Sequence, residues 1–425
     1  MKTWYRTWGM AVMAAALTLS ACGQTDNKPE QPAAKQEPVT LNFFYNGFSE
    51  SLTNQLKAKI EQKYPHITIH MILHGTGTTI DDTIAAGTKL DLAAFTMGQL
   101  FKVMELKLVS DMSDLVSKHG FDLNRLAPGV LDAVKGYSEK GEILVMPYEL
   151  NNSVLLYNKS IFDKFGVAYP KDGVTWDEVT ELIRKTSRTE NGVAYKGFSY
   201  SGANPVYKNQ FGLPFVDPQT NKSALSHDGW QKWLGAMTSF YKIPNNSLEG
   251  NADNAFFKNK TMAMRTGPNP LDLLPAAIES GLDWDAATMP KFPTNESSGS
   301  QLNAPFYLIP PASPHRDEAF QVIVYLMSDE MQTWNARQGR VPIVKSESVV
   351  QQFGADLPFL QGKNYTNAVF KEVIAKPVRV TRYDGIVRTE LAAALAEVAQ
   401  KGTDVNTALR SAEERANKLI AEQMK

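Results

Sequence analysis

The stretch 146–158, Met-Pro-Tyr-Glu-Leu-Asn-Asn-Ser-Val-Leu-Leu-Tyr-Asn, brings together aromatic rings and several donor and acceptor groups. Its proline and paired asparagines interrupt strand patterning, and the apolar, β-prone run Val154 to Tyr157 follows directly. This change predicts backbone that leaves one core and enters another, and the path between the cores carries Tyr148, Glu149, Asn151 and Asn152. Clefts between domains are where small-ligand sites concentrate, so the stretch predicts a ligand site. The alternative is a surface loop that precedes a core strand.

Three aromatic side chains near predicted strand ends or in a loop are further candidates for ligand contact. Phe48 follows the predicted strand 39–45, and Phe95 lies with Thr96 in the predicted turn where the chain emerges from a buried run after Asp91. Such positions suit a ligand, because open α/β sheets bind ligands beyond the carboxyl ends of their parallel strands. Tyr207 lies in the aromatic, turn-rich segment 200–215, a mixture more typical of binding surfaces than of linkers. The alternative for each ring is that it packs a core.

The sequence contains none of the motifs that would indicate catalysis or a bound cofactor. We find no Gly-x-Ser-x-Gly, no His-Glu-x-x-His and no glycine-rich phosphate loop. His66, His70 and His74 recur along a predicted strand, where a rise of about 3.3 Å per residue separates neighbours in this series by roughly 13 Å. That distance is too long for one metal ion. We therefore expect no catalytic residue, no metal and no cofactor.

The composition of the chain narrows the class of protein. With 425 residues the chain exceeds one ordinary core, which predicts two or three lobes, and 43% hydrophobic with 21% charged residues is typical of a globular protein. Lys+Arg 44 against Asp+Glu 45 leaves a formal net charge of -1. This balance gives no electrostatic basis for binding nucleic acid or an acidic membrane surface.

The N-terminus has the pattern of an export signal. Basic residues precede an apolar run from Trp8 to Leu19, which is too short to span a membrane. The sequence Leu-Ser-Ala-Cys-Gly that ends it resembles a bacterial lipobox, and Cys22 is the one cysteine in the chain. We expect residues 1–21 to be a lipoprotein signal peptide, Cys22 to carry a lipid anchor and residues 22–38 to be a disordered tether. The alternative is a chance cysteine after a cleavable signal.

The elements that would position the candidate side chains alternate between strands and helices. The pattern predicts a strand at 39–45, a helix with Leu52, Leu56 and Ile60 on one face, and a strand at 66–73. Strand, helix and strand in this order imply a parallel βαβ unit and an α/β lobe. Further helices are indicated by the capping box Thr175 to Glu178, by Ser313-Pro314 with proline at the first helical position, and by apolar faces in 387–400 and in 405–424, where Leu419 faces inward.

Several loosely defined motifs follow one another in a fairly specific order. They are Pro147-Tyr148, Leu156-Tyr157-Asn158-Lys159, Ile161 to Gly166, Thr175 to Glu178, Phe257 to Met264 and Ala319-Phe320 to Ser328. In order and spacing the chain resembles the extracellular solute-binding proteins of family 1, the substrate receptors of ABC importers. The resemblance implies an α/β, two-lobed periplasmic-binding-protein-like fold with a ligand cleft between the lobes. It implies an N-terminal lobe of 39–149 and 307–340, a C-terminal lobe of 150–306 and 341–425, and three crossings near 149–152, 301–306 and 337–342.

The resemblance also implies ligand contacts at individual positions. Asn151 lies where maltose-binding relatives have a carboxylate that meets sugar hydroxyls, and an amide there still offers a donor and an acceptor. Asn269 lies where those relatives place a stacking tryptophan, Tyr383-Asp384 lies near a second aromatic pair, and Phe306 falls at the second crossing. These departures imply a ligand other than a maltodextrin. For Asp384 the alternative is a helix cap.

We therefore expect a monomeric receptor, lipid-anchored on the extracytoplasmic face of the cell membrane. It would capture a carbohydrate, an oligosaccharide, between closing lobes and deliver it to the permease subunits of an ABC importer. One alternative is a secreted lipoprotein glycoside hydrolase that uses two carboxylates. Others are a receptor for a charged solute or a peptide, or a ligand-loaded partner of a sensor kinase.

Overall fold

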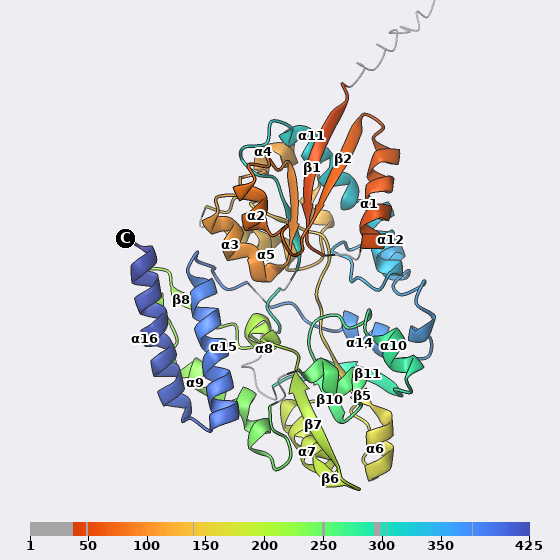
Figure 1. Ribbon diagram of the computed structural model, residues 1–425, viewed down its shortest axis with the longest axis vertical. Helices are drawn as coiled ribbons and strands as arrows, with labels where there is room; N and C mark the ends of the chain where they lie inside the picture. Colours follow the sequence, from red (N-terminus) through yellow and green to blue (C-terminus); the bar gives the residue numbers. More distant parts are fainter. Residues whose placement is uncertain are drawn as a thin grey trace, which may run out of the picture. The chain divides into compact units, whose positions relative to one another are not determined.

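The computed structural model describes residues 37–47, 50–138, 140–248, 251–292, 299–302, 304–375 and 377–425. Pro38–Lys425 form one compact unit. The predicted signal peptide and Cys22 lie outside the described residues, as do Phe48 and nearly all of the predicted tether. Within Pro38–Lys425 the protein has a mixed α/β fold built on two five-stranded sheets (Figure 1).

The first sheet confirms the predicted βαβ unit. Its strand order is β2-β1-β3-β12-β4, with β1 parallel to β2 and to β3, and with β12 antiparallel to β3 and β4. The strands are β1 (Val39–Tyr45), β2 (Ile67–Leu73), β3 (Leu92–Phe95), β4 (Met146–Pro147) and β12 (Phe306–Leu308). Helix α1 (Glu50–Lys63) connects β1 to β2 and buries Leu56 and Ile60. Helix α1 therefore buries one face as its sequence pattern predicts, and β2 begins with the predicted alternation, whereas all of β3 and the last three residues of β1 are buried.

The second sheet follows in the chain and has the order β11-β5-β10-β7-β6. Strand β10 is parallel to β7 and antiparallel to β5, while β11 is antiparallel to β5 and β6 to β7. Its strands are β5 (Val154–Asn158), β6 (Arg188–Glu190), β7 (Val193–Tyr200), β10 (Met262–Thr266) and β11 (Trp284–Thr288). A short hairpin, β8 (Val216–Asp217) and β9 (Lys222–Ser223), forms a separate two-stranded sheet.

Helices supply most of the remaining core. Between β2 and β5 lie α2 (Ile80–Ala85), α3 (Leu100–Glu105), α4 (Ser113–Lys118) and α5 (Val130–Gly136). Between β5 and β12 lie α6 (Lys159–Phe165), α7 (Trp176–Thr186), α8 (Asn204–Lys208), α9 (Asp228–Ser239) and α10 (Leu274–Glu279). After β12 lie α11 (Arg316–Leu326), α12 (Asp329–Arg337), α13 (Glu347–Val350), α14 (Tyr365–Phe370), α15 (Asp384–Lys401) and α16 (Val405–Gln423), the last two side by side in Figure 1.

Two details of the predicted helices are wrong. Helix α11 begins at Arg316, two residues after Pro314, because the Ser313 hydroxyl accepts the backbone N–H of His315 and forms a turn ahead of the helix. Leu419 is 42% exposed, whereas Leu409 and Ile420 of the same helix are buried. The capping box of α7 is confirmed: Thr175 Oγ1 accepts the N–H of Glu178, and the Glu178 carboxylate accepts the N–H of Thr175.

Candidate functional site

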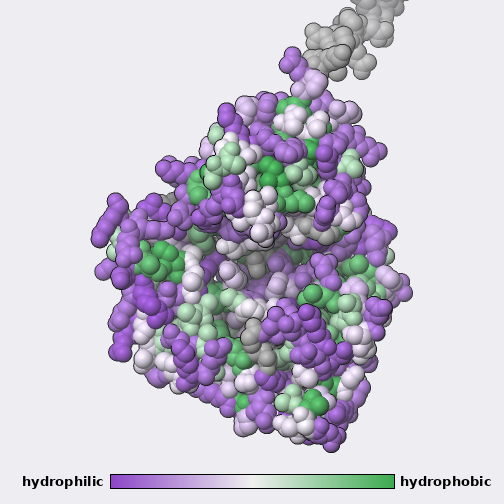
Figure 2. Space-filling view, in the orientation of Figure 1, coloured by the Kyte–Doolittle hydropathy of each residue, from purple (hydrophilic) through white to green (hydrophobic). Residues whose placement is uncertain are grey.

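A cavity of about 440 Å³ lies where both sheets end. Its lining includes residues that follow the carboxyl ends of four strands, namely Gly47 after β1, Thr96, Met97 and Gly98 after β3, Ser201, Gly202 and Ala203 after β7, and Pro268 after β10. In each sheet these strands pair in parallel, so their ends point to one edge, which is where open α/β sheets bind ligands. The remaining lining residues are Tyr148, Glu149, Asn151, Asn204, Tyr207, Pro305 and Arg340. Polar residues (purple) cover most of the face in Figure 2, and the middle of this face is hollowed.

The predicted crossing segments meet beside this cavity. The chain passes from β4 in the first sheet to β5 in the second through 148–153, and it returns from β11 to β12 through the segment that contains Pro305. Tyr148 N–H donates to Pro305 O at 3.2 Å, and Leu150 N–H donates to Val341 O at 2.8 Å. Val341 belongs to the third predicted crossing, 337–342. Backbone hydrogen bonds therefore hold the three crossing segments side by side.

An ion pair between Glu149 and Arg340 forms part of the cavity lining. Arg340 Nη1 lies 3.0 Å from Glu149 Oε2 and 3.2 Å from Oε1, and each side chain is 15% exposed. Burial alone would lower the pKa of Arg340, but the Glu149 carboxylate outweighs burial and the pKa is raised. The two charges neutralise each other. Among the described lining residues no other side chain carries a formal charge.

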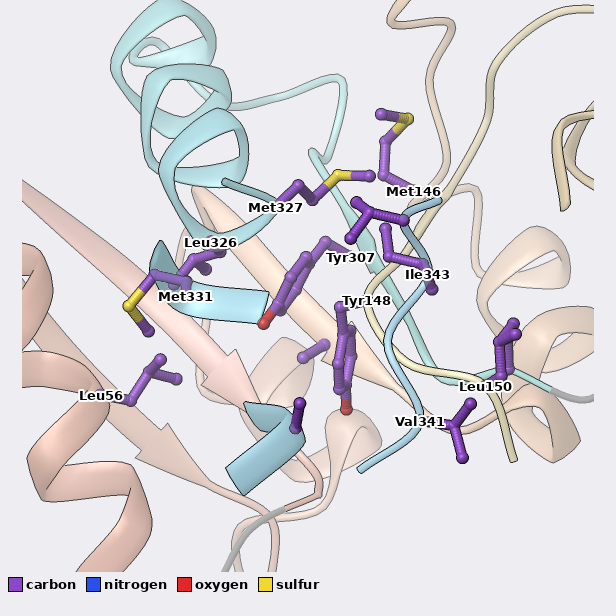
Figure 3. Packing of buried hydrophobic residues seen from close by; sticks show 14 of the residues in the cluster. Leu56, Met146, Tyr148, Leu150, Tyr307, Leu326, Met327, Met331, Val341 and Ile343 are labelled. Carbon is purple, nitrogen blue, oxygen red and sulfur yellow. The ribbon is translucent and has the colours of Figure 1, made fainter. Parts of the chain in front are cut away.

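Three buried tyrosines, Tyr45, Tyr148 and Tyr307, lie close to this ion pair. The rings of Tyr148 and Tyr307 stack with centroids 4.4 Å apart, and Figure 3 shows them face to face among apolar side chains that include Met327 and Ile343. Burial raises the pKa of Tyr45, Tyr148 and Tyr307, and Glu149 adds to the effect. All three phenols therefore stay neutral at physiological pH. A Cβ on Gly47 would lie 2.9 Å from the Tyr148 hydroxyl, so only glycine leaves room for this ring.

Asn151 and Tyr207 are the two predicted contact residues that line the cavity. Asn151 Oδ1 accepts the N–H of Asn269 at 3.1 Å, which fixes the orientation of its amide. Tyr207 lies on α8, and a Cβ built on Gly98 would be 3.7 Å from its hydroxyl, so residues after β3 approach the ring closely. Asn204, on the same helix, is 4% exposed and its Oδ1 has no hydrogen-bond partner among the described residues. A buried acceptor without a partner beside a cavity is suited to a ligand hydroxyl.

Phe95 and Phe306 lie elsewhere, inside the first sheet. Both side chains are 0% exposed, and the residues face each other across the β3–β12 ladder. The ring of Phe95 also stacks on Phe44 at 5.2 Å. Neither residue belongs to the lining of the cavity, and their structural role is packing.

Asn269 joins the predicted crossings 149–152 and 337–342, through the bond to Asn151 described above and through a second bond to Gly339. Its Nδ2 donates to Gly339 O at 2.9 Å, and its Oδ1 accepts the N–H of Leu271 at 3.0 Å. Both ends of the amide are therefore occupied. The neighbouring Pro268, rather than Asn269, lines the cavity.

Tyr383 and Asp384 are buried at the start of α15, at 3% and 1% exposure. Asp384 Oδ1 accepts the N–H and the hydroxyl of Thr381, so the carboxylate orders the turn before α15, whereas the expected alternative was a cap on a helix that begins near Ile386. Its Oδ2 has no hydrogen-bond partner among the described residues. Burial raises the pKa of Asp384, and the Arg388 guanidinium and the bonds from Thr381 oppose the shift. Asp384 borders a separate small cavity of about 30 Å³.

Several residues that line the cavity were not predicted from the sequence. Ser201 to Asn204 form a short run of small and polar residues directly after β7, and recognising that strand end would have indicated them. Arg340 had no comparable signal, because its partner Glu149 lies 191 residues away. Glycine and proline positions such as Gly98 and Pro268 likewise become part of a site only once the fold brings them together.

In the described part of the chain, no three His, Cys, Asp or Glu side chains form a group that could hold a metal ion. The same residues include no helix that has both the length and the apolar composition to cross a membrane.

The fold and the cavity at the sheet ends define a two-lobed binding protein. The profile of the bacterial extracellular solute-binding proteins matches residues 34–356, and the chain belongs to this family.

Individual relatives agree with this assignment. A multiple sugar-binding protein of Streptococcus mutans is 25% identical over 190 residues, which cover 43% of this chain and only 41% of that protein. An ABC substrate-binding protein from Listeria monocytogenes in complex with cycloalternan has a TM-score of 0.73 at 17% identity, covering 91% of this chain and 100% of that one. UgpB from Mycobacterium tuberculosis in complex with glycerophosphocholine has a TM-score of 0.70 at 17% identity, covering 92% and 100%. The structural matches establish the fold.

Proposed function

We propose that this protein captures a neutral carbohydrate, an oligosaccharide, in the cavity around Asn151 and Tyr207 and delivers it to the permease subunits of an ABC importer. The observation that carries the proposal is the chemistry of the lining, which combines a tyrosine ring with amide groups and leaves no unpaired charge among its described residues. Sugars present C–H faces that stack on rings and hydroxyls that bond to amides. The cavity volume of about 440 Å³ is within the range of small-ligand sites.

The ligands of the relatives support a sugar, and one of them defines the main alternative. The Listeria protein is described with cycloalternan and the Streptococcus protein as sugar-binding, whereas the Mycobacterium protein binds glycerophosphocholine. Glycerophosphocholine carries a phosphate and a quaternary ammonium group. An unpaired cation suits a phosphate, and an open aromatic face suits a quaternary ammonium group. Arg340 is already paired with Glu149, which favours a ligand without a phosphate.

A glycoside hydrolase is the alternative from another class. Its relatives are solute-binding proteins, which supports binding rather than catalysis. Hydrolysis of a glycosidic bond uses two carboxyl groups that flank the bond. Glu149 is the one carboxylate among the described lining residues, and it is already paired with Arg340. The described lining therefore does not contain the second carboxyl group that this hydrolysis uses.

The test is a thermal-shift and calorimetric screen of the soluble protein without its signal peptide. The panel contains glycans, including cycloalternan, and glycerophosphocholine as the charged comparison. A ligand that binds only the folded protein raises its melting temperature. We expect a glycan to raise it, and we expect Asn151→Ala to weaken that glycan's binding while the exposed-site control Asn124→Ala does not. A response to glycerophosphocholine alone, or release of products from any glycan, would refute the proposal.

Anchoring through Cys22 is part of the proposed function. The expected lipid on its thiol is the membrane attachment that the sequence indicates, because the apolar run before it is too short to span a bilayer. We expect Cys22→Ala to shift the processed protein from the membrane fraction to the soluble extracytoplasmic fraction, with its melting temperature unchanged. Correctly cleaved Cys22→Ala protein that stays in the membrane fraction after a salt wash would require a different anchor.

A further inference from the structure

A buried ion pair between Lys208 and Glu372 is hydrogen-bonded to the cavity residue Asn151 without lining the cavity itself. Lys208 Nζ is 2.9 Å from Glu372 Oε2, and each side chain is 3% exposed. Charges so deeply buried lose their hydration, and the loss is tolerated when each charge is paired and also hydrogen-bonded. The hydrogen bonds of this pair therefore show which parts of the chain it holds.

Those hydrogen bonds lead to the crossing segments. Lys208 Nζ donates to Asn151 O at 2.8 Å. Glu372 Oε2 accepts the N–H of Ser153 at 2.7 Å, and Glu372 Oε1 accepts the Ser300 hydroxyl at 2.7 Å. One carboxylate and one ammonium group thus join two crossing segments to each other.

The same region is reinforced by the backbone. Gln301 N–H donates to Lys208 O at 2.7 Å, and Asn152 Nδ2 donates to Val369 O at 3.0 Å. Residues 151–153, the segment around Ser300 and the residues from Val369 to Glu372 are therefore tied together around the end of α8.

The ion pair is one step removed from the ligand site. Lys208 is the last residue of α8, the helix that presents Asn204 and Tyr207 to the cavity. The carbonyl that Lys208 holds belongs to Asn151, whose side chain lines the same cavity. A shift of Lys208 would move both walls at once.

We infer that Lys208 and Glu372 are positioning residues for the ligand site, holding Asn151 and α8 in the arrangement that binds the sugar. The inference rests on the proposed function for the identity of the ligand. It adds a role for residues that touch no ligand themselves. Pre-organisation of this kind raises affinity because less conformational freedom is lost on binding.

The experiment compares Lys208→Met with the double variant Lys208→Met/Glu372→Gln. The single variant leaves a carboxylate buried without its cation, so its melting temperature should fall. The double variant removes both charges, and the amide that replaces the carboxylate keeps an acceptor for Ser153 and a group for Ser300, so most of the melting temperature should return. The hydrogen bond to Asn151 O stays absent in both. We expect the double variant to bind the glycan selected in the screen at least tenfold more weakly than the unmodified protein.

A matched control removes an ion pair remote from the cavity. Lys118 and Asp317 form an exposed pair at 2.7 Å, and Lys118→Met/Asp317→Asn should leave glycan affinity unchanged. If the affinity of the Lys208→Met/Glu372→Gln variant instead recovers together with its melting temperature, the pair is structural only and the inference is overturned.

Amide hydrogen exchange of the empty protein tests the same inference without a ligand. We expect faster exchange at 151–153 and in α8 in the double variant, with unchanged exchange in α1. If no glycan binds the unmodified protein, the proposed function fails while this measurement still decides the positioning role. Unchanged exchange at 151–153 and in α8 would overturn it.

Discussion

At the scale of single residues, Tyr207 and Phe95 separate ligand contact from core packing. Tyr207 lines the cavity, so Tyr207→Ala should weaken glycan binding at least tenfold, about 1.4 kcal/mol, with little change in stability. Phe95 is 0% exposed, so Phe95→Ala should lower the free energy of unfolding by about 3 to 5 kcal/mol. Calorimetry and urea unfolding of both variants make the comparison. Normal melting with lost binding in Phe95→Ala would return that ring to the ligand site.

Asp384 gives a prediction about pH. Burial raises its pKa in the folded protein above the ordinary value of 3.8, so the folded state binds its proton more readily than the unfolded state does. The cost of burying the charged carboxylate is therefore present at neutral pH and disappears as the pH falls through the raised pKa. We expect the stability of the unmodified protein to increase relative to Asp384→Asn as the pH is lowered from 7 toward 4. Urea unfolding of the two proteins across this range measures the difference, and a difference that moves the other way contradicts the assignment.

The place of Asn151 and Tyr207 in the cavity lining could be predicted from the sequence, because a break in strand patterning and an aromatic, turn-rich loop marked them. Phe95 and Phe306 show the limit of the strand-end argument. A strand end carries side chains on both faces, and only the observed register of β3 against β12 shows that these two rings pack together in the core. The contribution of Arg340 could not be predicted, because it depends on a contact between residues far apart in the chain.

At the scale of elements, Gly339 tests how tightly the third crossing segment is packed. Its φ is +76°, and a Cβ there would lie 2.2 Å from Leu271 Cδ1 and 2.7 Å from Leu357 Cδ1. Gly339→Ala should therefore cost about 1 to 2 kcal/mol for the backbone and about 1 to 3 kcal/mol more for the crowding. Gly77→Ala is a matched control, because its φ is +77° and no atom lies within 4 Å of its Cβ, so it should show only the backbone cost. Equal urea midpoints for the two variants would contradict this packing.

The elements themselves were largely accessible to sequence reasoning. The strand 39–45, the helix that follows it and the capping box at Thr175 are confirmed, because each rests on short-range periodicity or on a local side-chain bond. The predicted start of α11 is wrong. The hydrogen bond between Ser313 and His315 forms a turn, and the helix begins only after it, at Arg316. The order of strands in the sheets also depends on pairing between distant segments, as β12 shows by inserting between β3 and β4.

At the scale of the whole protein, a ligand that contacts both walls of the cavity should bind a closed arrangement better than an open one. That difference in affinity shifts the population toward the closed form. Small-angle scattering with a saturating concentration of the glycan selected in the screen should give a smaller radius of gyration than scattering from the empty protein. The Asn151→Ala protein at the same glycan concentration provides the control, since weakened binding should reduce the change. An identical radius in both states would count against closure.

The pairing of Glu149 with Arg340 affects how ligand capture should depend on the salt concentration around the protein. A receptor whose cavity displays an unpaired charge attracts an oppositely charged ligand over several ångströms, and dissolved salt screens that attraction over a Debye length of about 8 to 10 Å. Here the two charges of the described lining cancel within a separation of 3.0 Å. If the proposed sugar is the ligand, its capture depends on diffusion and on contact alone, and we expect its association rate to be the same at low and at high salt concentration.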